Sequence, residues 1–99
     1  MSDGATDSAP AVVSEFFVEM AAPISNTQTC VTGHVFRGAF YTGSTVTVVS
    51  ADGIPLPAPI ARLGVQDAPV NVIREGPPAT MILDIEARYV VPGSRITST

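Results

Sequence analysis

The sequence lacks several residues on which common catalytic and binding sites depend. Its 99 residues contain no lysine, no tryptophan, one cysteine and one histidine. A phosphate-binding P-loop needs a lysine on the β and γ phosphates, so the chain cannot supply such a loop. A single cysteine permits neither an internal disulfide nor a thiolate metal cluster, and a lone histidine cannot define a metal site. We therefore expect no nucleotide hydrolysis, no metal and no cofactor in this chain.

Positive charge is scarce and scattered. The formal net charge is −4, the isoelectric point is near 4.6, and the five basic residues are all arginines spread along the chain. Proteins that bind by neutralising phosphates normally cluster Lys and Arg on one surface. The composition therefore disfavours direct nucleic-acid binding as the main role and leaves a local contact with RNA open.

Long apolar runs and a secretory signal are also absent. No run approaches the ~20 residues that a membrane-spanning helix needs. The first residues are rich in Ser, Asp, Gly and Ala and have neither a basic start nor an apolar stretch. We predict a disordered N-terminal tail over residues 1–13, no membrane span and a cytoplasmic protein.

What the sequence does contain is a series of short strand-like segments. Residues 14–21 alternate, which places Phe16, Val18 and Met20 on one face and leaves Phe17 as an aromatic on the charged face. That aromatic is interpreted as covered by the tail or a loop, or as part of an interaction patch.

The two clearest strands follow at residues 30–36 and 45–49, on either side of a segment punctuated by Gly38 and Gly43. Val31 and Val35 on the first and Val46 and Val48 on the second are predicted to face inward. Gly33 costs strand stability, so it indicates a bulge, a sharp bend or a place where another backbone comes close.

The second half of the chain reads as further strands separated by turns. Asp52-Gly53 predicts a tight turn, and prolines at 55, 57 and 59 predict a rigid extended loop. Residues 60–65 alternate, with Ala61, Leu63 and Val65 on one side, and a turn is predicted over residues 67–69. A short strand or an irregular crossing is predicted over residues 70–74. Strands are predicted over residues 79–87 and 95–99, with Met81, Leu83 and Ile85 facing inward.

No segment of ten or more residues shows a helical period. The sequence therefore predicts an all-β domain over residues 14–99, a small closed antiparallel β-barrel of six or seven short strands. An all-β sandwich is the alternative at this length.

The glycines and strands also form an ordered pattern. Val31-x-Gly33-x-Val35-x-Arg37-Gly38 is followed by Gly43 and Val46-x-Val48, and then by residues 60–65, 72–76, 79–85 and 92–96. Over residues 14–99 this order resembles the second domain of translational GTPases such as elongation factor Tu, a small antiparallel β-barrel. The chain departs from that family in its acidic balance, in its proline-rich residues 54–59 and in having no neighbouring GTP-binding domain.

The resemblance implies binding surfaces rather than chemistry. In elongation factors this barrel packs on the GTP-binding domain, and other surfaces of it meet the aminoacyl end of tRNA or the small ribosomal subunit. Only residues 34–41 can be carried across. The candidate partner-binding residues are His34, Phe36, Arg37, Phe40 and Tyr41. Their aromatic rings either cap one end of the barrel or form an exposed patch that holds a partner's base or apolar side chain.

The ionisable residues predict no catalytic constellation. Cys30 and His34 are four residues apart on one strand face, roughly 13 Å, which is too far for a thiolate and imidazole pair. Asp84 and Glu86 can imitate a general acid and base pair, but a solvated edge or a salt link to Arg62 or Arg88 is the simpler interpretation.

The expected function is therefore that of a non-enzymatic, stand-alone binding module. Its partner is expected to be a protein or a ribonucleoprotein, such as a GTP-binding domain or another translation component. The alternative is a structural or oligomerising barrel that pairs copies of itself through outward apolar residues such as Phe17 or Ile82.

Overall fold

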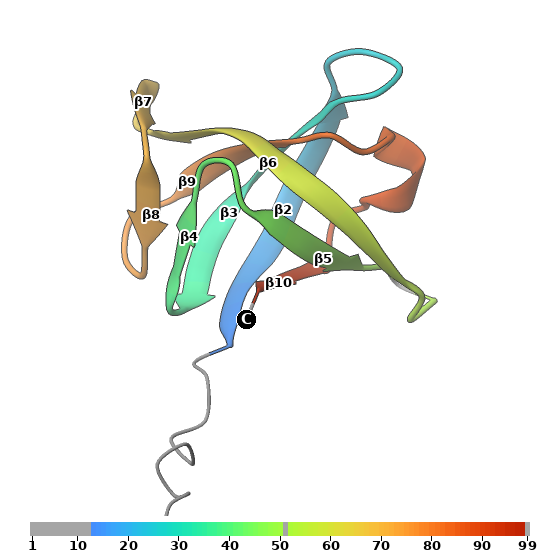
Figure 1. The fold of residues 1–99 in the computed structure, drawn as a ribbon, viewed down its shortest axis with the longest axis horizontal. Coiled ribbons are helices and arrows are strands. Elements are labelled where there is room, and N and C mark those ends of the chain that lie inside the picture. The colour runs from blue at the N-terminus through green and yellow to red at the C-terminus, as the bar shows by residue number, and fades with distance from the viewer. Residues whose placement is uncertain (1–12, 51, 99) are drawn as a thin grey trace, which may run out of the picture.

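The computed structural model describes residues 13–50 and 52–98. The predicted tail, residues 1–13, lies outside these described residues except for Val13. The described part of the chain is built almost entirely of strands (Figure 1). They are β2 (Ser14–Pro23), β3 (Thr29–Arg37), β4 (Ala39–Tyr41), β5 (Thr45–Val49), β6 (Pro55–Val65), β7 (Ala68–Val70), β8 (Val72–Arg74), β9 (Ala79–Leu83) and β10 (Arg95–Ser98), with one short 3₁₀ helix, η1 (Ala87–Tyr89).

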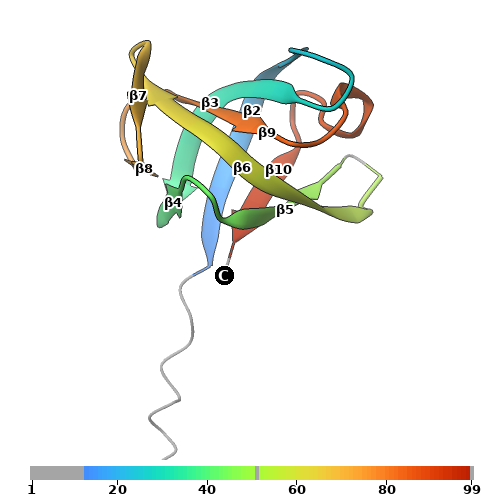
Figure 2. The ribbon, with the colours of Figure 1, turned by 45° about the horizontal axis from the view of Figure 1, so that its top comes forward.

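Six of these strands close into a barrel. They follow the order β5–β10–β2–β3–β9–β6, and β6 pairs again with β5. Every pairing among the described strands is antiparallel. Figure 2 shows the strands wrapping around a common interior. The predicted closed antiparallel barrel is confirmed, and the sandwich alternative is not what forms.

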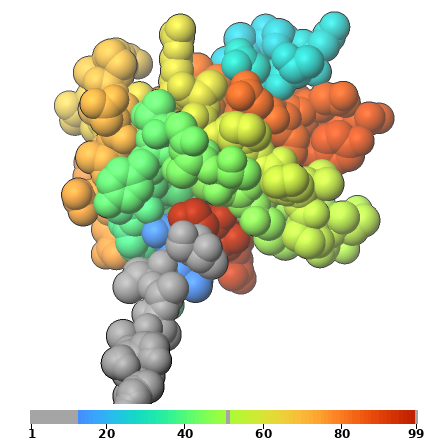
Figure 3. Space-filling model, viewed as in Figure 1, coloured from blue at the N-terminus to red at the C-terminus, as the bar shows by residue number. Residues whose placement is uncertain are grey.

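Three further strands lie outside this closed circuit of six. β7 extends the sheet beside the end of β6, while β4 and β8 pair only with each other. The β4–β8 pair stands at one end of the molecule, beside β7 (Figure 1). At the bottom of the space-filling view, the start of β2 lies against the end of β10 (Figure 3). This agrees with the register, which pairs Ser14 with Ser98.

The interior is filled as the alternation predicts. Phe16, Val18, Val31 and Val35 are buried, and so are Val46 and Val48 on β5 and Met81, Leu83 and Ile85 near the chain's end. Gly38 and Gly43 both have positive φ, 76° and 90°, which only glycine adopts without steric cost.

Two bulges interrupt the predicted alternation, and one of them makes an inward assignment wrong. Met20 was expected to face inward, yet it is 67% exposed, since one extra residue in β2 reverses the alternation after Val18. Ala61 is likewise the extra residue where the register of β6 against β9 shifts between Ile60 and Arg62. Ile60 and Leu63 are therefore the buried pair.

The proline segment is a strand and not the predicted loop. Residues 55–59 form the first half of β6, with Pro57 opposite Thr47 and Ala58 opposite Val46 on β5. Successive residues of an antiparallel strand direct their backbone groups to opposite edges, so prolines at every second position leave all their missing N–H groups on one edge. That edge faces away from β5, because the Pro59 carbonyl accepts the Asp84 N–H at 3.0 Å.

The turn before β6 forms at Asp52-Gly53, as predicted. The Gly53 N–H donates to the Ser50 carbonyl at 2.9 Å, and Gly53 has a φ of 83°. The pKa of the Asp52 carboxyl lies below its ordinary value. The main cause is the hydrogen bond from the Ser50 hydroxyl, and the second is the hydrogen bond from the Ile54 backbone N–H.

Two boundaries differ from the predictions. β9 ends at Leu83, where a strand to residue 87 was expected, and the chain turns into η1. The turn expected at residues 67–69 lies one residue earlier, because Gln66 and Asp67 take φ values of 53° and 65° and join β6 to β7 as a two-residue hairpin. No helix in the described part of the chain is long and apolar enough to cross a membrane.

Candidate functional site

Two β-bulges on the hairpin of β2 and β3 define the most distinctive surface of the barrel. The register of β2 against β3 shifts between Glu15 and Phe16, which leaves Phe36 unpaired as an extra residue on β3. It shifts back between Val18 and Met20, which leaves Glu19 as an extra residue on β2. Bulges bend a strand and re-aim the side chain of the extra residue. Phe36 and Glu19 therefore flank the cross-strand pair that lies between the two bulges.

The pair between the bulges is Phe17 opposite His34. Their ring centroids are 6.2 Å apart with planes tilted by 44°. Glu19 completes the arrangement, because its Oε2 lies 3.1 Å from His34 Nδ1. We call the four residues Phe17, Glu19, His34 and Phe36 the bulge patch.

Gly33 allows the two strands to approach where the patch forms. A Cβ atom at this position would stand 1.8 Å from the backbone oxygen of Phe17, far inside contact distance. Gly33 pairs with Val18, whose own N–H and C=O bond Ser94 and Gly93 at 3.1 Å and 2.8 Å on the other side. The backbone of β2 is therefore fixed from both sides. Of the alternatives predicted for Gly33, the close approach of another backbone is confirmed.

The bulge patch borders a hollow of about 450 Å³ with a largely apolar lining. Phe36 is 64% exposed and Phe17 is 41% exposed. The lining residues are Glu15, Phe16, Phe17, His34, Phe36 and Arg95.

Two polar pairs lie at the hollow. Arg95 Nη1 stands 3.9 Å from Glu15 Oε1, and Glu19 Oε2 lies 3.1 Å from His34 Nδ1. Such pairs contribute little to stability, and two carboxylates beside one arginine leave the rim without an excess of positive charge that would attract phosphates. The hollow therefore suits an apolar or aromatic side chain. Fully covering one Phe side chain contributes about 1.5–3 kcal/mol.

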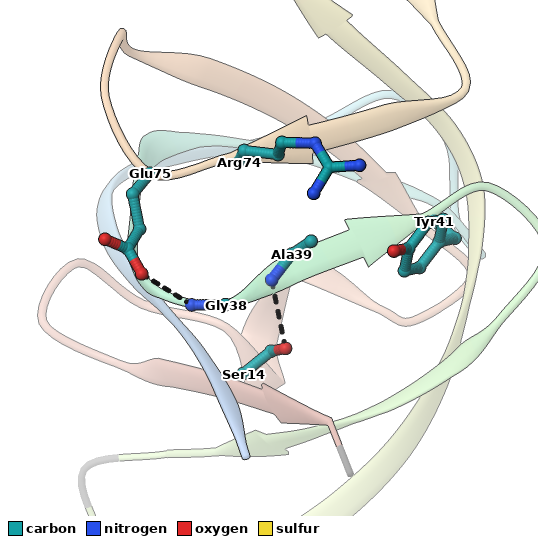
Figure 4. A pocket seen from close by; sticks show the side chains of 6 residues that line it. All are labelled: Ser14, Gly38, Ala39, Tyr41, Arg74 and Glu75. Carbon is teal, nitrogen blue, oxygen red and sulfur yellow. Dashed lines mark hydrogen bonds between the residues drawn. The ribbon is translucent and has the colours of Figure 1, made fainter. Parts of the chain in front are cut away.

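A second hollow, of about 500 Å³, lies at the β4–β8 end, where Arg74 and Glu75 are among its lining residues. Figure 4 shows it, with the Glu75 carboxylate accepting the Gly38 N–H at 2.9 Å and the Ser14 hydroxyl accepting the Ala39 N–H at 3.1 Å. The Arg74 side chain extends away from Glu75, toward the end of β4 that carries Tyr41. We call this the β4–β8 hollow; it is lined by Ser14, Gly38, Ala39, Tyr41, Arg74 and Glu75.

The structure divides the five predicted partner-binding residues among different places. His34 and Phe36 come together in the bulge patch. Tyr41, 53% exposed, lines the β4–β8 hollow. Arg37 is exposed at the end of β3, opposite Glu15.

Phe40 lies in the core and not in an exposed aromatic patch. It is 1% exposed and its ring meets Phe16 edge-on, with centroids 6.2 Å apart and planes at 86°. This geometry is favourable for two aromatic rings and makes Phe40 part of the core. The inward direction of its side chain follows from β4, which turns the middle residue of its three toward the barrel.

Glu19 was missed as a site residue. It was assigned to the charged face of β2 by alternation alone, and nothing in its own neighbourhood in the sequence shows that it is an extra residue. Phe17, by contrast, stood out as an aromatic on a charged face, and it is a member of the patch.

The residues considered for catalysis occupy structural positions. Glu86 forms the expected salt link to Arg88, with Oε1 and Nε 2.8 Å apart. Asp84 accepts a hydrogen bond from Gln28 Nε2 at 2.7 Å. Cys30 is half-buried on β3, and that burial raises the pKa of its thiol, which disfavours the reactive thiolate.

Comparison with known proteins identifies the fold. No protein-family model and no curated protein matches the chain. Translation elongation factor SelB from Methanococcus maripaludis is similar in structure, both in its apo form and in complex with the GTP analogue GppNHp. Each of these two structures matches with a TM-score of 0.78 and 20% identity, over 90% of this chain and 19% of the SelB chain. The chain therefore has the barrel fold found within a translational GTPase, as the resemblance implied, and spans about a fifth of that protein's length.

Proposed function

We propose that this chain is a binding module of the translation-factor barrel type, which engages a protein or ribonucleoprotein partner through the bulge patch and has no GTPase activity of its own. The observation that carries the proposal is the exposure of Phe17 and Phe36 between two bulges, on a barrel whose core is otherwise closed. Apolar side chains held in this way lose little conformational freedom when a partner covers them.

Two features support the absence of nucleotide hydrolysis and the choice of partner. The sequence has no lysine for a P-loop, and its acidic balance does not favour phosphate binding. SelB, whose structures match this barrel, is a translation elongation factor, so a translation component or GTP-binding domain is the partner class to examine first. The proposal places this interaction in the cytoplasm.

Capture of partners from a lysate of the source organism tests the proposal. Phe36→Ser removes the most exposed ring of the patch, and Ile54→Ser, at a position 56% exposed in the turn between β5 and β6, is the matched control. We expect the unaltered chain and Ile54→Ser to retain the same partner and Phe36→Ser to lose it. Retention by all three chains would contradict the role of the patch.

Treatment with ribonuclease separates the two partner classes. A partner retained after treatment is held by protein contacts, whereas a partner lost on treatment belongs to a ribonucleoprotein. Because Phe36 is mostly exposed, its substitution is expected to change the free energy of unfolding by within about 0.5 kcal/mol, which a urea titration checks beforehand.

The second candidate is a barrel that pairs with its own copy. The rim of the patch carries Glu15 beside Arg95 and Glu19 beside His34, so two patches related by a twofold axis can place the Arg95 of one copy near a carboxylate of the other. Light scattering on the purified chain separates the two functions. A dimer that Phe36→Ser converts to a monomer supports self-pairing, and a monomer at every concentration excludes it.

A further inference from the structure

The hollow beside the bulge patch combines apolar walls with one hydrogen-bond acceptor. Three of its lining residues are phenylalanines, Phe16, Phe17 and Phe36. Another is Glu15, whose side chain is only 21% exposed. Among the described residues, the ion-pair contact of this carboxylate is with Arg95 Nη1 at 3.9 Å, which is too long for a hydrogen bond. A carboxylate is an acceptor on both oxygens, so Glu15 can take a hydrogen bond from a group that enters the hollow.

The backbone around the hollow leaves recognition to side chains. β2 is paired along one edge with β10 and along the other with β3. A partner therefore finds no open edge of β2 that an added strand could extend. It has to place a side chain in the hollow, whose volume of about 450 Å³ accommodates even the largest one.

Two arginines disfavour a cationic side chain at Glu15. Arg95 already stands beside this carboxylate, and Arg37 is its register partner on β3. A third guanidinium or an ammonium placed there would be repelled by both. A neutral donor meets no such repulsion, and it still gains the stronger hydrogen bond that a charged acceptor gives.

Tryptophan is the neutral side chain that matches both the walls and the acceptor. Its indole carries one N–H donor and no acceptor, on a large apolar ring system that packs well against other aromatic rings. A tyrosine hydroxyl also donates, but it is an acceptor as well, and its ring covers less apolar area. The sequence contains no tryptophan, so this occupant belongs to another protein and not to a second copy.

We propose that the partner of this module presents a tryptophan, whose ring enters the hollow beside Phe17 and Phe36 and whose Nε1–H donates to the Glu15 carboxylate. The inference rests on the proposed function, because it names the side chain with which a protein, alone or within a ribonucleoprotein, engages the bulge patch. Glu15 then selects the partner, and the two phenylalanines supply the apolar contact. Because an indole is neutral, its binding depends little on salt.

N-acetyl-tryptophanamide is the probe that tests this inference. The chain lacks tryptophan, so the indole fluorescence of the probe has no background from the protein. We expect this fluorescence to change on titration with the full-length chain, and the NMR amide signals of Phe17, His34 and Phe36 to shift with the same midpoint. The analogue methylated at the indole nitrogen lacks the donor and should bind roughly tenfold more weakly. The acetylated amides of leucine, tyrosine and arginine should also bind more weakly.

Protein variants identify the acceptor. Glu15→Gln keeps the shape of the side chain but makes the acceptor neutral, so it should weaken the tryptophan probe roughly fivefold. It should leave the methylated analogue unaffected, because that analogue donates no hydrogen bond. Asp67→Asn is the matched control, since Asp67 is exposed in the turn between β6 and β7 and its φ of 65° is one that asparagine adopts. This control should change the affinity of neither probe.

Four outcomes would overturn the inference. Equal binding of the leucine or tyrosine probe would show that the hollow takes any apolar or aromatic side chain. Tighter binding of the arginine probe would show that the occupant is basic. No shift of the patch signals with any probe would exclude an indole in the hollow, and unchanged affinity in Glu15→Gln would exclude Glu15 as its acceptor. In each case the proposed function is decided separately, by whether Phe36→Ser loses the partner captured from the lysate.

Discussion

Single residues decide where the barrel of this chain departs from a regular pleat. Gly33 is the clearest case, because its missing side chain leaves space for the Phe17 carbonyl to approach. The neighbouring residues then form a bulge, and the bulge aims Glu19 at His34. The absence of one Cβ atom is therefore linked to the geometry of the proposed binding surface.

Gly33→Ala is expected to destabilise the protein and disturb the patch. The new Cβ would meet a backbone oxygen at 1.8 Å, and backbone held on both sides cannot yield without loss of hydrogen bonds. We expect the free energy of unfolding to fall by about 1–3 kcal/mol or more, measured by urea denaturation. Thr32→Ala, at the next residue of β3, is the control and should change it by within about 0.5 kcal/mol. Equal stability of the two variants would contradict the close approach.

At the scale of elements, the predictable features are the local ones. Alternating Val31, Val35, Val46 and Val48 identify their strands and inward faces without reference to partners. Glycine at positions of positive φ likewise identifies the turns.

Bulges escape such reasoning, because an extra residue exists only relative to the strand opposite. Glu19 and Ala61 therefore shift the faces of Met20 and Ile60 without a local signal. The inward turn of Phe40 also depends on its neighbours, because β4 has only three residues and is placed by its pairing with β8. These effects explain why the patch was only half predicted.

β6 provides a test of how prolines enter a barrel. Pro57 directs its missing donor away from β5, so Pro57→Ala should cost only about 0.4–1 kcal/mol, mainly because the unfolded chain gains freedom. Ala58 is buried opposite Val46 and directs its N–H toward β5, so Ala58→Pro should cost about 3 kcal/mol or more.

Urea denaturation measures both changes, and amide hydrogen exchange at Val46 and Val48 shows whether the ladder persists. We expect protection of these amides to survive Pro57→Ala and to be lost with Ala58→Pro. A similar cost at the two positions would show that the edge assignment of the prolines is wrong.

At the scale of the whole molecule, the sequence predicts that the sheet closes into a barrel, but it does not predict the order of the strands around that barrel. Many short strands with frequent turns favour a closed sheet, because closure leaves no long edge exposed. The order of the strands follows from long-range pairing. β10 joins the barrel between β2 and β5, and the four residues of β10 contain no signal that predicts those two neighbours.

Because β10 closes the barrel, its one buried side chain is expected to contribute more to stability than a strand of four residues would suggest. Ile96 is fully buried and lies opposite Phe16 on β2 and Val48 on β5, so it packs at the seam. Ile96→Ala should lower the free energy of unfolding by about 2–5 kcal/mol, a large share of the roughly 5–15 kcal/mol typical of a domain.

Val70→Ala, on the appended strand β7, is the matched control. Val70 is half-buried and pairs only with Leu63 of β6, outside the closed circuit, so its loss should cost about 1 kcal/mol. Tyrosine fluorescence and circular dichroism in urea should give one shared transition for each variant, since a closed barrel unfolds as a unit. Two outcomes would show that β10 does not close the barrel: a cost of Ile96→Ala no larger than that of Val70→Ala, or fluorescence and circular dichroism transitions of Ile96→Ala that do not coincide. In either case the bulge patch would lie on an open sheet and would lack the support of a closed barrel.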